Sequence, residues 1–329
     1  MRSATRNAYG GPEVLTLGDV ATPSPAEDEI LIRVHASSVN PADWHVMKGS
    51  PWLVRLQSGL RRPKRPELGT DVAGVVVAVG SGVTEFAVGD AVWGGARGAY
   101  AEYALAKERT LVPQPEGVGF ATTGAIAIAG LTALQGLRHK AGLEAGDHAL
   151  IIGASGGVGT YAVQIAKADG AEVTAVVSGR NVQLMRELGA DHVVDYETSD
   201  FAATDVRYDA ILDNVGLRPF SDLRRILKPT GTYVLVSGPK GALLGPLPRM
   251  LRMMLLSLTT RQRLRPFLST FDKADLEELS ELVRSGEVRT VFDRRYGLPE
   301  IAEAMRHQGE GHAQGKTVIV VRDAEPGNG

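Results

Sequence analysis

Residues 151–160 read IIGASGGVGT, an apolar run that leads into a turn rich in glycine. The run is typical of a strand, and residues 157–170 have helical spacing with Gly170 as the stop. The turn fits the pattern G-x-G-x-x-G, in which glycines let the backbone approach a pyrophosphate at the N-terminus of the helix. We therefore expect it to bind a dinucleotide, although a turn that binds nothing is the alternative. The predicted binding residues are Ala154 (in place of the first glycine), Ser155, Gly156, Gly157, Val158 and Gly159.

Strand-like and helical segments alternate along the chain around this turn. HALIIGA (148–154), AEVTAVVSG (171–179), DHVVDY (191–196), YDAILDNVG (208–216) and TYVLVSG (232–238) are typical of strands, and helical patterns separate most of them. Such alternation predicts an α/β fold with a doubly wound parallel sheet and helices on both faces. The chain before about residue 118 instead reads as β-rich, and a stretch rich in Pro and Gly, VPQPEGVGF (112–120), indicates the boundary. The last strand, GKTVIVV (315–321), is expected to rejoin the first domain.

The end of the second strand indicates which dinucleotide binds. NAD-binding proteins usually carry an acidic residue there, about 20 residues beyond the glycine turn, to bind the ribose 2′-hydroxyl. This chain has Ser178, Arg180 and Asn181 around that place, and the next acidic residue is Glu187. A guanidinium group suits a 2′-phosphate, so we predict NADPH; a solvated loop arginine is the alternative.

Composition excludes several classes of function. The chain has 329 residues and no cysteine, which rules out disulfides, thiolate nucleophiles and zinc sites made of cysteine. Its net charge of −2 argues against nucleic acid as a partner. Neither a signal peptide nor a membrane span is expected, since Pro246, Pro248, Arg249 and Arg252 interrupt the apolar stretch 243–258. A cytoplasmic location is therefore predicted.

With these segments in place, the chain resembles the medium-chain dehydrogenase/reductase superfamily, above all its zinc-independent quinone oxidoreductase branch. The resemblance lies in residues 71–94, GAYAEYA (98–104), GASGGVGTYAVQIAK (153–167) and LGADHVVDY (188–196). It implies a GroES-like β-barrel catalytic domain built from residues 1–118 and 265–329. A Rossmann domain, residues 119–264, would be inserted between these two parts.

The resemblance also bears on metal and reaction. Zinc-dependent relatives carry Cys where this chain has Asn40, and Gly-His-Glu where it has Gly69, Thr70 and Asp71. Because catalytic zinc needs three protein ligands, no metal is predicted. Without a Lewis acid, hydride transfer from NADPH to a quinone or an activated enone is the easier reaction. An enoyl-thioester reductase and a non-catalytic NADPH-binding protein remain alternatives.

The resemblance further implies roles for single residues. Asn40 is expected to donate a hydrogen bond to the acceptor oxygen, and His45 to polarise the carbonyl or pass on a proton. A homodimer joined through exposed sheet edges such as TYVLVSG is also expected. An apolar stripe on a predicted helix over residues 247–258 suits a lid over the substrate, a core helix or a dimer contact. Its members are Leu247, Met250, Leu251, Met254, Leu255 and Leu258. The residues implied to lie near the cofactor are Tyr196, Asn214, Val215, Ser237 and Lys316.

Overall fold

The computed structural model describes residues 1–237, 247–257, 259–311 and 313–322. Contacts within the chain divide it into two compact units. The first contains Met1–Ala129, Phe271–Gly286 and the described chain from Phe292 onward, and the second contains Gly130–Thr270 and Glu287–Val291. The sequence predicted boundaries at residues 118 and 264, whereas the two units found from contacts change over after Ala129 and after Thr270.

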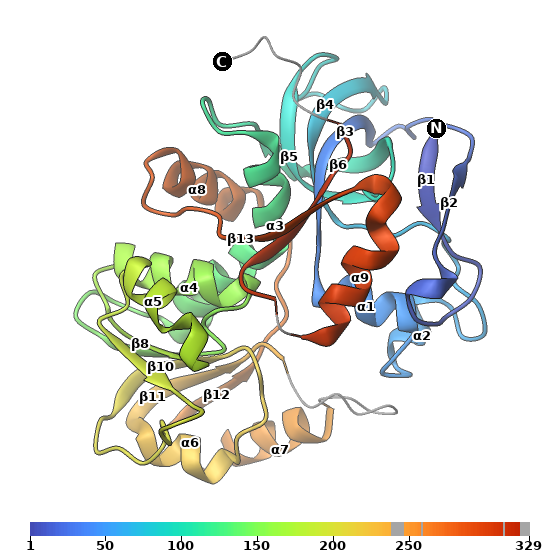
Figure 1. Ribbon diagram of the computed structural model, residues 1–329. Helices are drawn as coiled ribbons and strands as arrows, with labels where there is room; N and C mark the ends of the chain where they lie inside the picture. The colour runs from blue at the N-terminus through green and yellow to red at the C-terminus, as the bar shows by residue number, and fades with distance from the viewer. Residues whose placement is uncertain (238–246, 258, 312, 323–329) are drawn as a thin grey trace. The chain divides into compact units, whose positions relative to one another are not determined.

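The first unit is built around a small barrel (Figure 1). Strand β3 pairs antiparallel with both β4 and β6, and β4, β5 and β6 pair in sequence, which closes the ring. The C-terminal strand β14 pairs with β3 through Thr317 and Val39, so the chain end rejoins the first unit as predicted. The strands are β1 (Arg2–Thr5), β2 (Thr16–Asp19), β3 (Glu29–Val39), β4 (Asp71–Val79), β5 (Ala91–Arg97), β6 (Tyr103–Pro113), β13 (Phe292–Gly297) and β14 (Lys316–Val320).

Helices cover the barrel of the first unit. Asn40 is the N-cap residue of α1, and the Asp43 carboxylate accepts a hydrogen bond from Asn40 N at 3.0 Å. The helix stops at Gly49, whose φ of +59° favours glycine. The capping pair thus fixes two polar side chains where β3 leaves the barrel. The helices are α1 (Pro41–Lys48), α2 (Val54–Ser58), α3 (Phe120–Leu134, which runs on into the second unit), α8 (Lys273–Arg284) and α9 (Ile301–Glu310).

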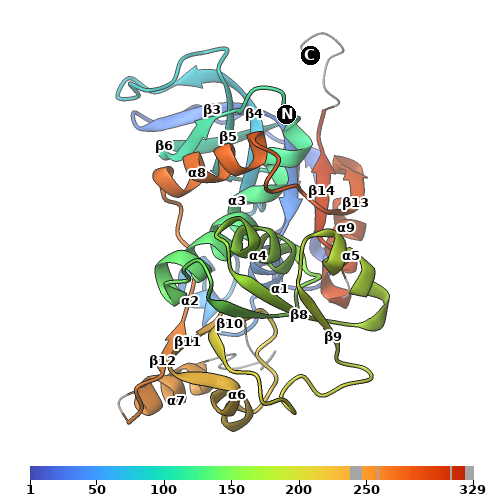
Figure 2. The same ribbon diagram turned by 90° about the vertical axis from the view of Figure 1, so that its left-hand side faces the viewer.

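The second unit is the predicted doubly wound α/β domain. Its six described strands are parallel in the order β12-β11-β10-β7-β8-β9, and the chain reverses direction across the sheet between β7 and β10. Figures 1 and 2 show α4 and α5 on one face of the sheet and α6 and α7 on the other. The elements are β7 (His148–Ile152), α4 (Gly157–Ala168), β8 (Glu172–Val177), α5 (Val182–Glu187), β9 (His192–Asp195), β10 (Tyr208–Asp213), α6 (Phe220–Ile226), β11 (Leu227–Leu235), α7 (Leu247–Ser257) and β12 (Arg263–Pro266).

Two details of this unit differ from expectation. The stretch TYVLVSG is not a sheet edge, because β12 pairs with β11 from Thr232 to Leu235 and takes the outer position. Helix α7 buries Met253 in the core, with Leu256 packed against it, whereas Leu251 and Leu255 of the predicted stripe are exposed. The side chains of Leu247, Met250, Met254 and Leu258 lie outside the described residues.

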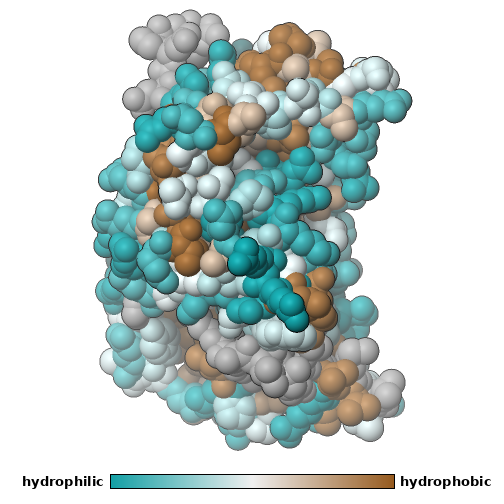
Figure 3. All heavy atoms as spheres, turned by 90° about the vertical axis from the view of Figure 1, so that its right-hand side faces the viewer, coloured by the Kyte–Doolittle hydropathy of each residue, from teal (hydrophilic) through white to brown (hydrophobic). Residues whose placement is uncertain are grey.

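One helix has the length and hydropathy to cross a membrane, which sequence reasoning did not anticipate. It comprises α3 and the π-helical turn Gln135–Ala141 that continues it. Its most apolar window is 78% buried within the protein, which is what a core helix shows. On the face drawn in Figure 3, hydrophilic residues surround smaller hydrophobic patches.

Candidate active site

The glycine turn between β7 and α4 has the close packing that a phosphate-binding loop requires. Gly153 has φ +73°, and a Cβ atom there would lie 2.7 Å from Val215 Cγ2. At Gly159 a Cβ would come within 2.5 Å of the Ala154 Cα, so only glycine lets α4 pack on the strand. A Cβ at Gly156 would meet only Gly153 O at 3.6 Å, which leaves space over the loop. Sequence alignment put Ala154 at the first position, but Gly153 makes the left-handed turn.

The predicted cofactor residues of the second unit converge on one edge of its sheet. Strands β7 to β11 are parallel neighbours, so their carboxyl ends lie at the same edge. This is where open α/β sheets bind ligands, and the reversal between β7 and β10 is the usual position. The residues that follow these strand ends are the loop 154–159 after β7, Ser178, Arg180 and Asn181 after β8, Tyr196 after β9, Asn214 and Val215 after β10, and Ser237 after β11.

Asn181 connects two of these strand ends. Its side-chain Nδ2 donates hydrogen bonds to Ser155 Oγ and to Ser178 Oγ, both at 3.0 Å. Asn181 and Ser178 are buried, whereas Arg180, between them in a short 3-10 turn, is exposed. Asn181 therefore holds the glycine loop against the end of β8, and Arg180 is presented to solvent beside it.

Two carboxylates that sequence reasoning missed lie beside this turn. The Glu197 carboxylate accepts a hydrogen bond from Gly179 N at 3.2 Å. Asp195 Oδ2 lies 2.9 Å from the position that a Cβ of Gly179 would occupy. Asp195 is the last residue of β9 and Glu197 follows that strand, which pairs in parallel with β8. The sheet thus brings Glu197 to Gly179 from 18 residues further along the chain. A fixed spacing after the glycine turn does not reveal them.

Asn214 is held at the end of β10, next to the glycine loop. Its Nδ2 donates to Ile152 O at 3.1 Å, and its Cβ lies 3.5 Å from the Cβ position of Gly153. Among the described residues its buried Oδ1 has no hydrogen-bond partner. A buried acceptor without a partner is costly, so this atom indicates a ligand that donates a hydrogen bond there. The open loop and this acceptor fit a dinucleotide. Val215, Tyr196 and Ser237 are exposed at the same edge.

The first unit contains a buried polar cluster around Asp71, the first residue of β4. Asp71 Oδ2 accepts hydrogen bonds from Ser38 Oγ at 2.5 Å and Asn40 Nδ2 at 2.9 Å, and Oδ1 accepts one from Ile128 N at 3.0 Å. Lys316 Nζ donates to Asn40 Oδ1 at 2.6 Å and lies 3.6 Å from Asp71 Oδ2. Burial lowers the pKa of Lys316, and Asp71 opposes that shift. The structure thus unites Asn40 and Lys316, which are 276 residues apart.

A second buried acid lies next to this cluster. Burial raises the pKa of Asp43 to about 6, the charge of Asp71 adds to the shift, and the hydrogen bond from Asn40 N opposes it. Burial likewise raises the pKa of Tyr100, whose hydroxyl donates to Ser38 O at 3.2 Å. Two buried acids, one lysine and one amide therefore form a connected group, of which sequence reasoning named only Asn40 and Lys316 as site residues.

His45, the other predicted catalytic residue, is half-buried on α1. Its Nδ1 lies 2.8 Å from Ser50 O, and since a carbonyl only accepts, Nδ1 carries the hydrogen. In the neutral ring Nε2 is then an acceptor, and only the imidazolium form has a proton to give from Nε2. The ring is thereby fixed in orientation.

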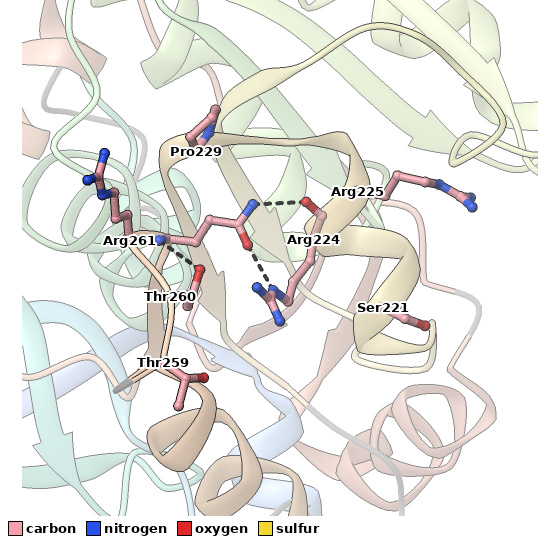
Figure 4. Close-up of a pocket in the computed structure, with 8 residues that line it drawn as sticks. Ser221, Arg224, Arg225, Pro229, Thr259, Thr260 and Arg261 are labelled. Carbon is pink, nitrogen blue, oxygen red and sulfur yellow. Dashed lines mark hydrogen bonds between the residues drawn. The ribbon is translucent and has the colours of Figure 1, made fainter.

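A hollow of about 690 Å³ lies elsewhere on the second unit (Figure 4). Three arginines, Arg224, Arg225 and Arg261, contribute to its lining, and Gln262 holds Arg224 by accepting from its Nε at 2.9 Å. These residues lie near the amino ends of β11 and β12, at the opposite edge of the sheet from the glycine loop. The hollow is therefore separate from the predicted cofactor residues.

Comparison with known proteins agrees with this architecture. Residues 26–116 match the alcohol dehydrogenase GroES-like domain, and residues 188–319 match the zinc-binding dehydrogenase family. A chloroplast envelope quinone oxidoreductase homolog of Arabidopsis thaliana is 37% identical, over 97% of this chain and 98% of its own.

Two solved structures extend the comparison. A quinone oxidoreductase from Coxiella burnetii superposes with a TM-score of 0.85 at 32% identity, covering 98% of this chain and 99% of its own. A mycobacterial protein, Rv1454c, solved in complex with NADPH, superposes with a TM-score of 0.83 at 27% identity, covering 98% of this chain and all of its own.

Proposed function

Because this chain belongs to the medium-chain dehydrogenase/reductase superfamily, in its quinone oxidoreductase branch, we propose that it reduces quinones with a nicotinamide cofactor. The observation that carries the proposal is the carboxyl edge of the second unit's sheet. There a tightly packed glycine loop lies next to Asn214, whose buried Oδ1 has no hydrogen-bond partner among the described residues. We propose NADPH as the cofactor and a quinone or activated enone as the acceptor.

The residues at this edge bind and orient the cofactor. Backbone N–H groups at the start of α4 would bind the pyrophosphate, and Gly156 leaves room for its approach. Asn214 Oδ1 would accept a hydrogen bond from the nicotinamide half, and Tyr196 would contact the adenosine half. When bound, the reduced nicotinamide supplies a hydride. The contribution of the protein is orientation and a polar contact to the acceptor.

Asn40 and His45 are the residues we propose for that contact. The Asn40 amide is oriented by Asp71 on its nitrogen and Lys316 on its oxygen. Its NH₂ group has a second hydrogen, which is suited to the oxygen that gains negative charge as a quinone is reduced. His45 donates a proton to the same product when it is in the imidazolium form. Lys316, predicted at first as a cofactor residue, is proposed instead to position Asn40.

We propose that no zinc takes part in this reaction. At the positions where zinc-dependent relatives carry their ligands, this chain has Asn40, Thr70 and Asp71. The amide and the carboxylate are engaged with each other and with Lys316, so a metal would have to displace a buried ammonium group. Activity should therefore persist after treatment with a chelator.

The preference for NADPH over NADH is proposed to rest on Arg180. Its guanidinium group is exposed next to Ser178, where the adenosine ribose would lie. The carboxylates of Asp195 and Glu197 beside Gly179 would repel the ribose 2′-phosphate of NADPH and favour the free 2′-hydroxyl of NADH. The preference should accordingly be smaller than an arginine alone would produce.

A panel of acceptors tests the proposal. Purified protein is mixed with NADPH and a benzoquinone, a naphthoquinone, an α,β-unsaturated ketone or an enoyl-CoA, and NADPH oxidation is followed by absorbance. We expect turnover with the quinones, slower turnover with the ketone and loss of most activity in Asn40→Ala, with Gln57→Ala, an exposed position in the same unit, as control. Turnover with the enoyl-CoA alone, or tight NADPH binding without any turnover, would overturn the proposal.

A further inference from the structure

Three side chains that can bind a metal ion meet at the other edge of the second unit's sheet. His148, Glu172 and His192 are the first residues of β7, β8 and β9. The parallel register pairs His148 with Glu172, and His192 with Thr174, so the three residues lie side by side on neighbouring strands. Their position at the amino ends of the strands separates them from the glycine loop at the carboxyl ends.

The distances within this group suit one small ion. His192 Nε2 lies 2.7 Å and His148 Nε2 lies 3.6 Å from Glu172 Oε1, and one ligand atom of each residue lies within 4.8 Å of the others. Tetrahedral zinc with ligands at about 2.1 Å separates neighbouring ligand atoms by roughly 3.4 Å. The two distances to Glu172 lie on either side of that value, so modest side-chain rotation would form the site.

The surroundings favour a cation at this place. Glu172 and His192 are about half exposed, so an ion reaches them from solvent. The hydrogen bond from His192 lowers the pKa of Glu172, and burial lowers the pKa of His148, which favours the neutral imidazole that metals require. The nearby cations Lys228 and Lys167 are each paired with a carboxylate, those of Asp209 and Asp191. Thr174 Oγ1, 3.3 Å from His148 Nε2, is a contact that a metal would displace.

We propose that His148, Glu172 and His192 form a binding site for a divalent metal ion of the zinc type, with water completing the coordination. Two imidazoles and one carboxylate are a ligand set that suits Zn²⁺ and its first-row neighbours. Because a metal binds only deprotonated ligands, binding should weaken as the pH falls.

The consequence of binding is structural. Strand β9 has four residues, lies at the outer position of the described sheet and pairs with β8. An ion held by the first residues of β7, β8 and β9 would link the outer strand to the two inside it. Bound metal should therefore raise the unfolding temperature of the protein, because it binds only the folded arrangement.

Cobalt titration tests this site without reference to catalysis. Co²⁺ is added to the full chain after treatment with a chelator, and visible absorption and the unfolding temperature are recorded; Zn²⁺ is then added as competitor. We expect saturable binding of one ion, bands of tetrahedral Co²⁺ that Zn²⁺ abolishes, and a higher unfolding temperature. Loss of a group that only hydrogen-bonds a metal ligand costs about 10- to 100-fold in metal affinity. Loss of a ligand itself should cost more, so His192→Ala and Glu172→Gln should each weaken binding by at least about 100-fold.

The exposed His139 supplies the control, and His139→Ala should bind as the parent does. Circular dichroism checks that each variant is folded. If His192→Ala does not fold, Glu172→Gln still tests the site, because it keeps the size and shape of the side chain. Absence of saturable Co²⁺ binding, or equal affinity in the parent and both folded variants, would overturn the proposal. Neither outcome bears on whether the protein reduces quinones, because no turnover is measured.

Discussion

Replacing Lys316 by methionine should destabilise the protein strongly, although burial of this lysine is itself unfavourable. The Lys316 ammonium and the Asp71 carboxylate lie 3.6 Å apart with side chains 3% and 0% exposed. At an effective dielectric constant of 20, two unit charges at that distance attract by about 5 kcal/mol. Burial lowers the pKa of Lys316 despite that attraction, so the desolvation cost is of similar size. The pair as a whole is therefore close to neutral, whereas each charge alone is costly.

This balance predicts the outcome of a double-mutant cycle. Lys316→Met leaves Asp71 buried without its cation, and Asp71→Asn leaves the ammonium without its anion, so each should cost about 3–5 kcal/mol. The double variant removes both charges and should lie within about 1 kcal/mol of the parent protein, because replacing a whole buried pair is often neutral. The amide oxygen introduced by Asp71→Asn can keep the hydrogen bond from Ile128 N, which donates to Oδ1. The amide nitrogen then takes the place of Oδ2, where the Ser38 hydroxyl can turn from donor to acceptor.

Denaturant unfolding measures the cycle, with fluorescence reporting the first unit through Trp93, which is buried in it. Quinone turnover provides a second readout, since loss of Lys316 also frees the Asn40 oxygen and should lower kcat more than it raises KM. Additive costs in the double variant would show that the two charges do not interact. A folded Lys316→Met variant as stable as the parent would show that Asp71 does not need this cation.

Three further predictions concern the cofactor, a buried acid and the assembly. Arg180→Ala should weaken NADPH binding by about tenfold or more, since a hydrogen bond to a charged group contributes about 1.5–3 kcal/mol, and should leave NADH binding unchanged. Glu197→Gln should increase the preference for NADPH. Equal effects of either variant on the binding of both cofactors, measured by calorimetry, would contradict these roles. Because burial raises the pKa of Asp43 to about 6, the folded protein holds this proton more tightly than the unfolded chain, and stability is lost as pH rises from about 4 to 6. The stability of Asp43→Asn relative to the parent should therefore rise over that interval by up to about 3 kcal/mol and stay constant above pH 7. Thermal unfolding at a series of pH values measures this difference. A stability difference that does not change with pH would exclude a raised pKa of Asp43. The protein should form a homodimer through the outer strand β12, and a monomer at micromolar concentration in light scattering would count against it.

The α/β class, the glycine loop and the return of the last strand to the first domain could all be predicted from the amino-acid sequence. These features are visible because each depends on residues close together in the chain. A strand, a glycine turn and a helix follow one another within about twenty residues. The glycines that phosphate binding requires also lie within this short stretch. The carboxyl edge of the sheet could also be anticipated, since parallel strands must end on the same side.

Contacts between side chains that are remote in the chain became apparent only in the folded protein. Strand β14 places Lys316 against Asn40 and Asp71, β9 brings Glu197 to Gly179, and β12 covers the strand expected at the sheet edge. The left-handed turn at Gly153 and the burial that raises the pKa of Asp43 also depend on residues that are distant in the chain but packed around them. The reason is physical: charge, burial and hydrogen bonding depend on distances in space, and pairing registers between remote strands set those distances. In a hairpin the connecting turn fixes the register, but strands that are remote in the chain have no such turn between them.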